Sequence, residues 1–228
     1  LRELGLCAPV GQGTVIDVGA NIGVISIGML QNREFARAIA IEPDPRNFSL
    51  LERNVRQNRL AEKMTCLPVA VSDRQGTVEF ELSAENFGDH RVRTASHGTY
   101  AAEAFGEAAR RVISVPARRL DDLVAELPSE WTQDVALIWM DVQGHEGSVL
   151  RGARQLLSRG VPVVAEFWPY GLARSGMSRD DFLDLTSQVF TSFWALRQGR
   201  FVQHPIGALD RLFDELPGPN DFENLILV

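Results

Sequence analysis

Short apolar segments rich in β-branched residues alternate with helix-like segments along the first third of the chain. The expected strands and helices follow one another in the order 14–18, 22–30, 38–42, 45–58 and 64–71. Asp44 and Pro45 mark the start of the second helix, as an N-cap residue followed by proline at the first helical position. A β-α-β-α-β order predicts a parallel sheet with right-handed connections.

The middle of the chain has a weaker pattern. Residues 76–82 alternate apolar with polar side chains and predict a strand at an exposed edge, and 112–115 predicts another short strand. Residues 120–127 predict a helix. Between them, 83–110 is polar, contains several glycines and alanines, and has no clear period. We expect an irregular insertion there, as a loop, a lid or a partly disordered segment.

Regular periodicity returns after residue 134. The expected elements are strands at 135–141, 161–167, 192–196 and 225–228 and helices at 147–157 and 180–189. Neither a repeat nor a linker divides the chain. The pattern therefore predicts a single α/β domain over 1–228, built on a doubly wound, mostly parallel sheet of about seven strands with helices on both faces.

Composition narrows the class of protein. The chain has 228 residues, 23 basic and 30 acidic, and a formal net charge of −7, which argues against a nucleic-acid binder. Two cysteines, Cys7 and Cys66, are too few for a disulfide framework or a zinc cluster. No apolar run is long enough to span a membrane, and no signal peptide is visible at the N-terminus. We expect a cytoplasmic protein.

Acidic residues stand at the ends of four expected strands. They are Asp17, Glu42, Asp141 and Glu166. Ligands of open parallel sheets bind beyond the carboxyl ends of the strands, where these residues would converge. Each acid could instead cap the following helix or pair with an arginine. Because buried carboxylates are costly unless they are paired or bonded, the set of four favours a binding site at this edge.

A glycine turn follows the first strand, with the sequence Asp-Val-Gly-Ala-Asn-Ile-Gly at 17–23. Such a turn lets a ligand approach the backbone closely, although a purely structural turn has the same composition. The dinucleotide fingerprint requires glycine where this chain has Asn21 and Val24. Glu42 ends the second strand, where an acid can accept hydrogen bonds from ribose hydroxyls. The pattern favours adenosine without a pyrophosphate.

In these motifs the chain resembles class I S-adenosylmethionine-dependent methyltransferases, and within them the FkbM family. The resemblance covers 14–73 and 112–228, and its most specific part is Asp-Val-Gln-Gly-His-Glu at 141–146 followed by Leu-Arg-Gly-Ala at 150–153. The family usually has lysine where Trp139 stands. The resemblance implies S-adenosylmethionine as the cofactor, bound by Asp17, Gly19, Ala20, Asn21, Gly23, Glu42, Val71 and Asp141.

Methyl transfer to a hydroxyl needs the acceptor held close to the methyl group and a route for the hydroxyl proton. The expected catalytic residues are Asp141, His145 and Glu146. His145 could instead be an exposed residue, and Glu146 could simply favour the start of a helix. A divalent cation could also be held by Asp141, His145, Glu146 and Glu166. Because no ligand spacing among them is diagnostic, no metal site is predicted.

The acceptor is expected to be a small molecule or glycan. Glu166, Trp168 and Tyr170 are the expected substrate-binding residues, and 85–91 is a candidate lid. The two aromatic residues could equally belong to ordinary surface packing. We therefore expect a methyltransferase acting on a hydroxyl of a small molecule, sugar or lipid. The alternatives are a nicotinamide-dependent oxidoreductase and a non-catalytic adenosyl-binding domain.

Overall fold

The structure is a computed structural model of residues 1–228, and it describes all of them except 2, 7, 85, 87, 94–103 and 107–108. A sheet of eight strands has the order β11-β10-β12-β9-β8-β1-β2-β3. Its strands are β1 (Thr14–Val18), β2 (Arg37–Ile41), β3 (Met64–Leu67), β8 (Val135–Met140), β9 (Val163–Phe167), β10 (Ser192–Arg197), β11 (Arg200–Pro205) and β12 (Glu223–Leu227).

The large sheet is mixed. Five neighbouring strands of this sheet are parallel: β9, β8, β1, β2 and β3. Strand β12 pairs antiparallel with both β9 and β10, and β11 forms an antiparallel hairpin with β10. The prediction of an α/β fold is therefore right, and the prediction of about seven mostly parallel strands needs correction. The additional strand, β11, is largely exposed, so it has no buried face from which the hydrophobic pattern could reveal it.

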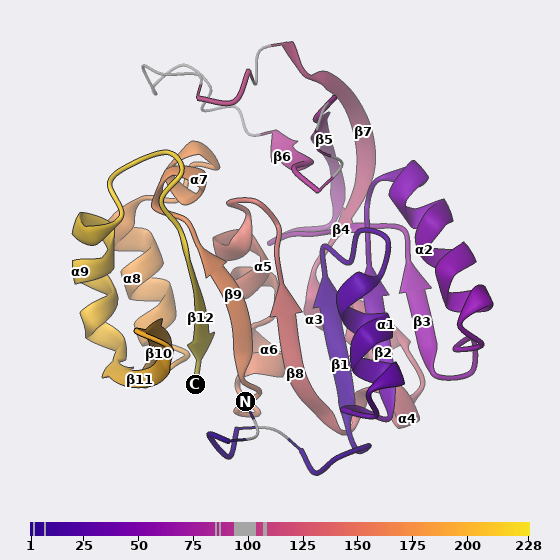
Figure 1. The fold of residues 1–228 in the computed structure, drawn as a ribbon. Coiled ribbons are helices and arrows are strands. Elements are labelled where there is room, and N and C mark those ends of the chain that lie inside the picture. Colours follow the sequence, from indigo (N-terminus) through magenta and orange to yellow (C-terminus); the bar gives the residue numbers. More distant parts are fainter. Residues whose placement is uncertain (2, 7, 85, 87, 94–103, 107–108) are drawn as a thin grey trace.

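Helices cover both faces of this sheet, as the sequence predicts (Figure 1). Because side chains alternate along a strand, Val15 and Ile16 point to opposite sides. Val15 packs in one apolar cluster with helix residues of the first third of the chain, such as Ile27 and Leu51, and Ile16 packs in another with helix residues of the later part, such as Leu150 and Phe182. The core is thus two apolar layers with the sheet between them.

The helices are short. They are α1 (Val24–Gln31), α2 (Pro45–Gln57), α3 (Leu120–Glu126), α4 (Ser129–Thr132), α5 (Glu146–Gly152), α6 (Arg154–Leu157), α7 (Pro169–Arg174), α8 (Arg179–Ser187) and α9 (Leu209–Glu215), with a 3₁₀ turn at Ile206–Ala208. Asp44 caps α2 as predicted, since its carboxylate accepts hydrogen bonds from the Arg46 and Asn47 amides. No helix in the described ranges has the length and apolar character needed to cross a membrane.

A second, four-stranded sheet lies above the carboxyl ends of the central strands (Figure 1). Its order is β4-β7-β5-β6, from the strands β4 (Ala70–Val71), β5 (Gly76–Leu82), β6 (Arg91–Arg93) and β7 (Arg111–Arg118). Two predictions are corrected here. Residues 64–71 are split between the two sheets at Pro68, which has no N–H to continue the pairing. Strand β5 is not at an edge, because it pairs with both β6 and β7.

A buried ion pair connects the small sheet to helix α7, which follows β9 of the large sheet. Glu81 of β5 is fully buried, and its carboxylate accepts hydrogen bonds from Arg174 of α7 at 2.8 and 3.0 Å and from Arg93 of β6 at 2.9 Å. Removing one partner of such a pair leaves an uncompensated buried charge. The small sheet is therefore fixed over the edge where the acidic residues converge.

Part of the expected insertion at 83–110 and of the candidate lid at 85–91 lies outside the described residues.

Candidate active site

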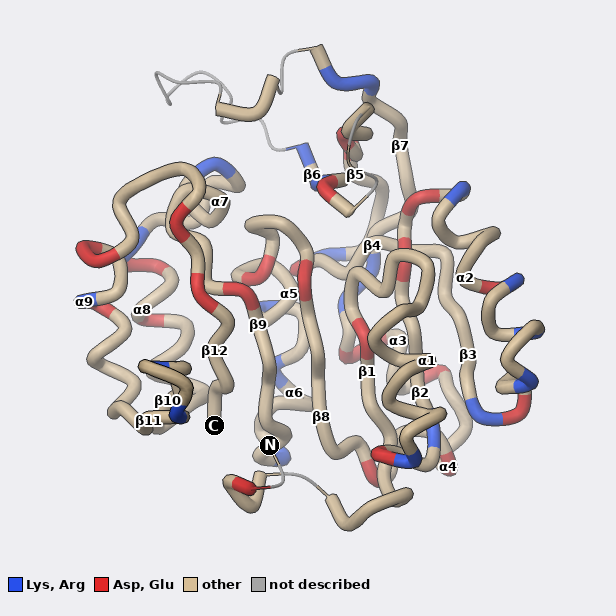
Figure 2. Tube along the Cα trace, viewed as in Figure 1, with Lys and Arg blue, Asp and Glu red and all other residues tan. Residues whose placement is uncertain are grey.

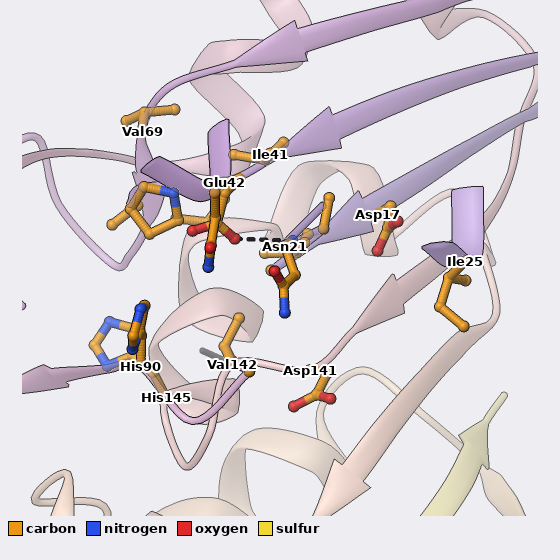
Figure 3. A pocket seen from close by; sticks show the side chains of 18 of the residues that line it. Asp17, Asn21, Ile25, Ile41, Glu42, Val69, His90, Asp141, Val142 and His145 are labelled. Atoms are coloured by element: carbon orange, nitrogen blue, oxygen red, sulfur yellow. Dashed lines mark hydrogen bonds between the residues drawn. The ribbon is translucent and has the colours of Figure 1, made fainter. Parts of the chain in front are cut away.

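A cavity of about 280 Å³ opens at the carboxyl ends of β1, β2 and β8, below the small sheet (Figure 3). Figure 2 shows acidic residues gathered along this edge, at the ends of β8 and β9 and the start of β12. The predicted site residues that line this first cavity are Asp17, Gly19, Ala20, Asn21, Glu42, Val71, Asp141 and His145. Gly23 and Glu146 lie outside its lining, and Glu166 and Trp168 line a second cavity.

The turn after β1 needs glycine for a reason that the sequence did not show. Gly19 has a left-handed backbone (φ +82°), and a Cβ atom there would lie 2.1 Å from the carbonyl oxygen of Asp141. The sequence interpretation reserved this space for a ligand, but the immediate neighbour is the backbone that follows β8. Asn21 also has a positive φ of 51°, which asparagine tolerates better than most residues. The turn and the end of β8 are therefore packed as one unit.

Glu42 holds the same turn from the other side. It is buried, its Oε2 accepts a hydrogen bond from the Asn21 amide at 2.9 Å, and its Oε1 accepts one from the Asp44 amide at 2.8 Å (Figure 3). Burial raises the pKa of Glu42 to about 7, although the two amide bonds lower it. A carboxylate has about four acceptor positions, so two remain for hydroxyl groups in the cavity.

Asp17 brings a second buried acid to the cavity. Its Oδ2 has no hydrogen-bond partner within the described part of the chain. Burial raises the pKa of Asp17 to about 6, and the charge of Asp141 raises it further. An unpaired buried carboxylate oxygen that faces a cavity is suited to a cationic ligand group, because a cation would compensate its lost solvation.

Asp141 follows β8 and is exposed to the cavity. Its Oδ1 accepts a hydrogen bond of 2.6 Å from the side-chain amide of Gln143. The surrounding protein raises the pKa of Asp141 through desolvation, and this hydrogen bond lowers it. The carboxylate is thus held in one orientation at the floor of the cavity.

His145, expected as a catalytic residue, lies on the other side of Val142 from Asp141, next to His90 (Figure 3). It is buried, and its Nε2 is hydrogen-bonded to the Ser72 hydroxyl at 3.2 Å. Burial lowers the pKa of His145 to about 4, so the imidazole is neutral at pH 7. This places an uncharged ring in the cavity wall and makes His145 a poor acceptor of protons.

Glu146, the other expected catalytic residue, is buried at the first position of α5. Its Oε1 accepts hydrogen bonds from the amides of Val142 at 3.2 Å and Gly144 at 3.3 Å. Burial raises the pKa of Glu146 to about 8, and the charges of Glu166 and Asp141 raise it further. The side chain thereby shapes the loop that carries Asp141.

We expect Glu146→Gln to reduce the loss of stability that the protein shows between pH 5 and pH 8. The folded-state pKa of Glu146 lies above the ordinary value of 4.5, so its contribution to stability is complete below that value and is lost as pH rises towards 8. Urea unfolding at the two pH values measures this. Asp17, Glu42 and Glu166 act in the same direction, so a smaller slope remains. The exposed Glu62→Gln is the control, and equal slopes in all three proteins contradict the interpretation.

The second cavity, of about 250 Å³, lies beside the first. Glu166 ends β9 and lines it, and burial raises the pKa of this carboxyl to about 7. Trp168 is buried there with its indole N–H donating to the Pro219 carbonyl at 2.7 Å. Tyr170 is outside the lining, but its ring lies 5.4 Å from Trp168 and 5.8 Å from Phe105, measured between centroids.

Sequence reasoning named Arg91 only as part of the candidate lid 85–91, and it gave no role to four other residues that line this second cavity: Phe105, Gln143, Asn220 and Phe222. Arg91 of β6 is 2% exposed, and its guanidinium lies 4.8 Å from the ring centroid of Trp168 and 4.9 Å from that of Phe105. The Arg91 Nε donates a hydrogen bond to Asp89 at 2.8 Å. Arg91 and Phe105 belong to the irregular segment 83–110, where only the alternation Arg-Val-Arg at 91–93 could have indicated a strand. Within the described ranges, no group of three or more His, Cys, Asp or Glu is arranged to hold a metal ion.

Comparisons with known proteins agree with this architecture. A family model described as the methyltransferase FkbM domain matches residues 17–189. The chain is 31% identical over 176 residues to the 2-O-methyltransferase NoeI of Sinorhizobium fredii, covering 75% of this chain and 70% of NoeI. It is 28% identical over 156 residues to the methyltransferase sdnD of Sordaria araneosa, covering 60% of this chain and 59% of sdnD.

The fold of this chain is similar to that of a solved methyltransferase structure. The FkbM methyltransferase from Methylobacillus flagellatus superposes with a TM-score of 0.54 at 19% sequence identity and covers 98% of this chain. This chain spans only 45% of that protein's chain. The similarity therefore concerns the α/β domain described above.

Proposed function

Because the chain belongs to the FkbM methyltransferase family, we propose that it transfers a methyl group from S-adenosylmethionine to a hydroxyl oxygen of a small molecule, sugar or lipid. The observation that carries the proposal is the charge of the first cavity. Three carboxyl groups line it, from Asp17, Glu42 and Asp141, and no Lys or Arg of the described chain does. Such a lining suits a ligand with positive charges and disfavours a pyrophosphate.

The residues present fit the parts of S-adenosylmethionine. The unpaired oxygen of Asp17 suits the ammonium group of the methionine part, and the remaining acceptor positions of Glu42 suit the ribose hydroxyls. Val69 and Val71 offer an apolar wall to the adenine, with His145 beside it. A nicotinamide dinucleotide would place its phosphates among these acids. The arrangement therefore supports the methyltransferase over an oxidoreductase.

When bound, S-adenosylmethionine supplies an electrophilic methyl group on a positively charged sulfur. The chain itself contributes orientation and charge. Asp141 presents a fixed carboxylate at the floor of the cavity, because Gln143 holds its Oδ1. Glu146 holds the amides of the same loop, and the neutral His145 closes the wall. Positioning of this kind can supply several kcal/mol of the reduction in the barrier. The name of NoeI, a 2-O-methyltransferase, supports oxygen as the accepting atom.

Calorimetric titration tests the cofactor. We expect binding of S-adenosylmethionine and none of NAD. Glu42→Ala should weaken the binding about 10- to 150-fold, which corresponds to roughly 1.5–3 kcal/mol for hydrogen bonds involving a charged group. Glu62→Ala, which removes an exposed carboxylate, should leave it unchanged. Thermal unfolding of both variants checks that they fold. Tighter binding of NAD than of S-adenosylmethionine, or full affinity in Glu42→Ala, contradicts the proposal.

A further inference from the structure

We propose that the second cavity holds a neutral sugar ring as the methyl acceptor and that the Glu166 carboxylate takes the proton from the acceptor hydroxyl. The inference rests on the proposed function, since it names the acceptor and the base for the same reaction. The sequence predicted that Glu166 binds the substrate, and in the structure Glu166 lines the second cavity.

The two cavities lie at the ends of neighbouring strands. In the parallel pair of β8 and β9, Met140 lies opposite Ala165, so Asp141 and Glu166 follow at the next position of each strand. Adjacent strands are about 4.8 Å apart, which brings the two acids side by side. Gln143 connects them further, because it lines the second cavity while its amide binds Asp141 in the first. An acceptor seated against Glu166 is therefore next to the floor of the cofactor cavity.

The lining of the second cavity matches a polyhydroxylated ring. Gln143 and Asn220 provide side-chain amides, which both donate and accept hydrogen bonds as vicinal hydroxyl groups require. The exposed Phe222 provides aromatic surface for the C–H groups of a ring, whereas Trp168 is buried and Arg91 lies over the rings of Trp168 and Phe105. The lining thus combines hydrogen-bonding groups on one part of its surface with apolar groups on another.

The charges around this cavity disfavour an anionic acceptor. Among the described residues of its lining, the one cation is Arg91, which binds Asp89 and lies over the rings of Phe105 and Trp168. The lining thus holds two acids, Asp89 and Glu166, against one cation, and Arg110 outside the lining also binds Asp89. This balance favours a neutral acceptor over a phosphate or a carboxylate. A neutral sugar satisfies the amides and the aromatic surface without adding a negative charge.

Glu166 is the best placed proton acceptor of the candidate site. Within the described chain its carboxylate makes no hydrogen bond to another residue, so it is available to a hydroxyl in the cavity. Burial and the charge of Asp141 raise its pKa to about 7, which suits a base at neutral pH. His145 is neutral with a pKa of about 4, and Glu146 is outside the lining of both cavities.

The proposed step balances as follows. The acceptor oxygen forms the new C–O bond, and the bond from the methyl carbon to sulfur breaks with its electron pair left on sulfur. The hydroxyl proton passes to Glu166, which later releases it to water. The products are a methyl ether, a neutral thioether and the regenerated carboxylate.

A kinetic comparison of Glu166→Gln with the exposed control Glu62→Gln tests the base. The acceptors are methyl α-glucopyranoside, methyl α-galactopyranoside and methyl α-mannopyranoside. We expect Glu166→Gln to lower kcat about 100-fold, the lower range for loss of a general base, with little change in KM. Wild-type kcat should rise with pH and level off above about 7, and this rise should be absent from Glu166→Gln. Wild-type kcat in Glu166→Gln overturns the role of the base.

Binding of the same glycosides to the protein without cofactor provides a readout independent of turnover. Saturation-transfer NMR should detect at least one of the three, with a signal reduced several-fold by Phe222→Ala, and should detect neither glucose 6-phosphate nor cyclohexanol. No bound glycoside, or preferred binding of the phosphorylated sugar or of cyclohexanol, overturns the acceptor class. Failure of the wild-type protein to bind S-adenosylmethionine contradicts the proposed function instead, which separates the two failures.

Discussion

Replacing Gly19 by alanine is expected to lower the free energy of unfolding by about 2–5 kcal/mol. A left-handed backbone costs a residue with a Cβ roughly 1–2 kcal/mol, and forcing an atom into a packed site adds about 1–3 kcal/mol. Both apply at Gly19, where φ is +82° and the new atom would lie 2.1 Å from the carbonyl oxygen of Asp141. Urea unfolding at pH 7 measures the change. Binding of S-adenosylmethionine should weaken in the same variant, because the loop after β8 must move.

Gly28 supplies the matched control. It lies in the middle of α1, and an added Cβ there would meet nothing within 4 Å. Gly28→Ala should therefore stabilise the protein by up to about 1 kcal/mol through helix propensity. Equal effects of the two substitutions would show that the contact between Gly19 and Asp141 has no special importance.

Asp141→Asn is expected to lower turnover about 1000-fold, the upper range for removal of one electrostatic group from an active site. The substitution keeps the shape of the side chain and an oxygen that can accept the bond from Gln143. It removes the negative charge that faces the cofactor cavity. That charge also raises the pKa of Glu166, so the pH at which kcat levels off should move down in the variant.

Steady-state kinetics between pH 5 and pH 9 measures both effects. Asp134→Asn is the control, because Asp134 is exposed just before β8 begins, whereas Asp141 follows the other end of that strand. Turnover within a few-fold of wild type in Asp141→Asn would place the decisive charge elsewhere. An unshifted pH profile with reduced turnover would contradict the coupling to Glu166.

The part of the site that the sequence predicted follows from local rules. Strand ends can be located from apolar runs, and parallel topology brings those ends together, so Asp17, Glu42 and Asp141 could be assigned to one cavity in advance. The cap of α2 at Asp44 likewise depends only on neighbouring residues. Such features need no knowledge of which distant segments pack together.

The remaining features depend on contacts between distant segments. Arg91 and Phe105 belong to a segment without periodicity, and only the position of the small sheet brings them to Trp168. The exposed strand β11 has no buried face, and β4 joins a different sheet from β3 across Pro68. Asp141 and His145 line the same cavity, as their common motif suggested, but only the structure shows that the ring of His145 is turned towards Ser72.

The central claim is that the first cavity binds S-adenosylmethionine, and a crystal structure with S-adenosylhomocysteine tests it most directly. We expect density in that cavity, with the ribose hydroxyls in hydrogen-bond distance of Glu42, the amino group at Asp17 and the sulfur facing the junction of Asp141 and Glu166. Density for the ligand outside this cavity, or a ribose with no contact to Glu42, would contradict the account.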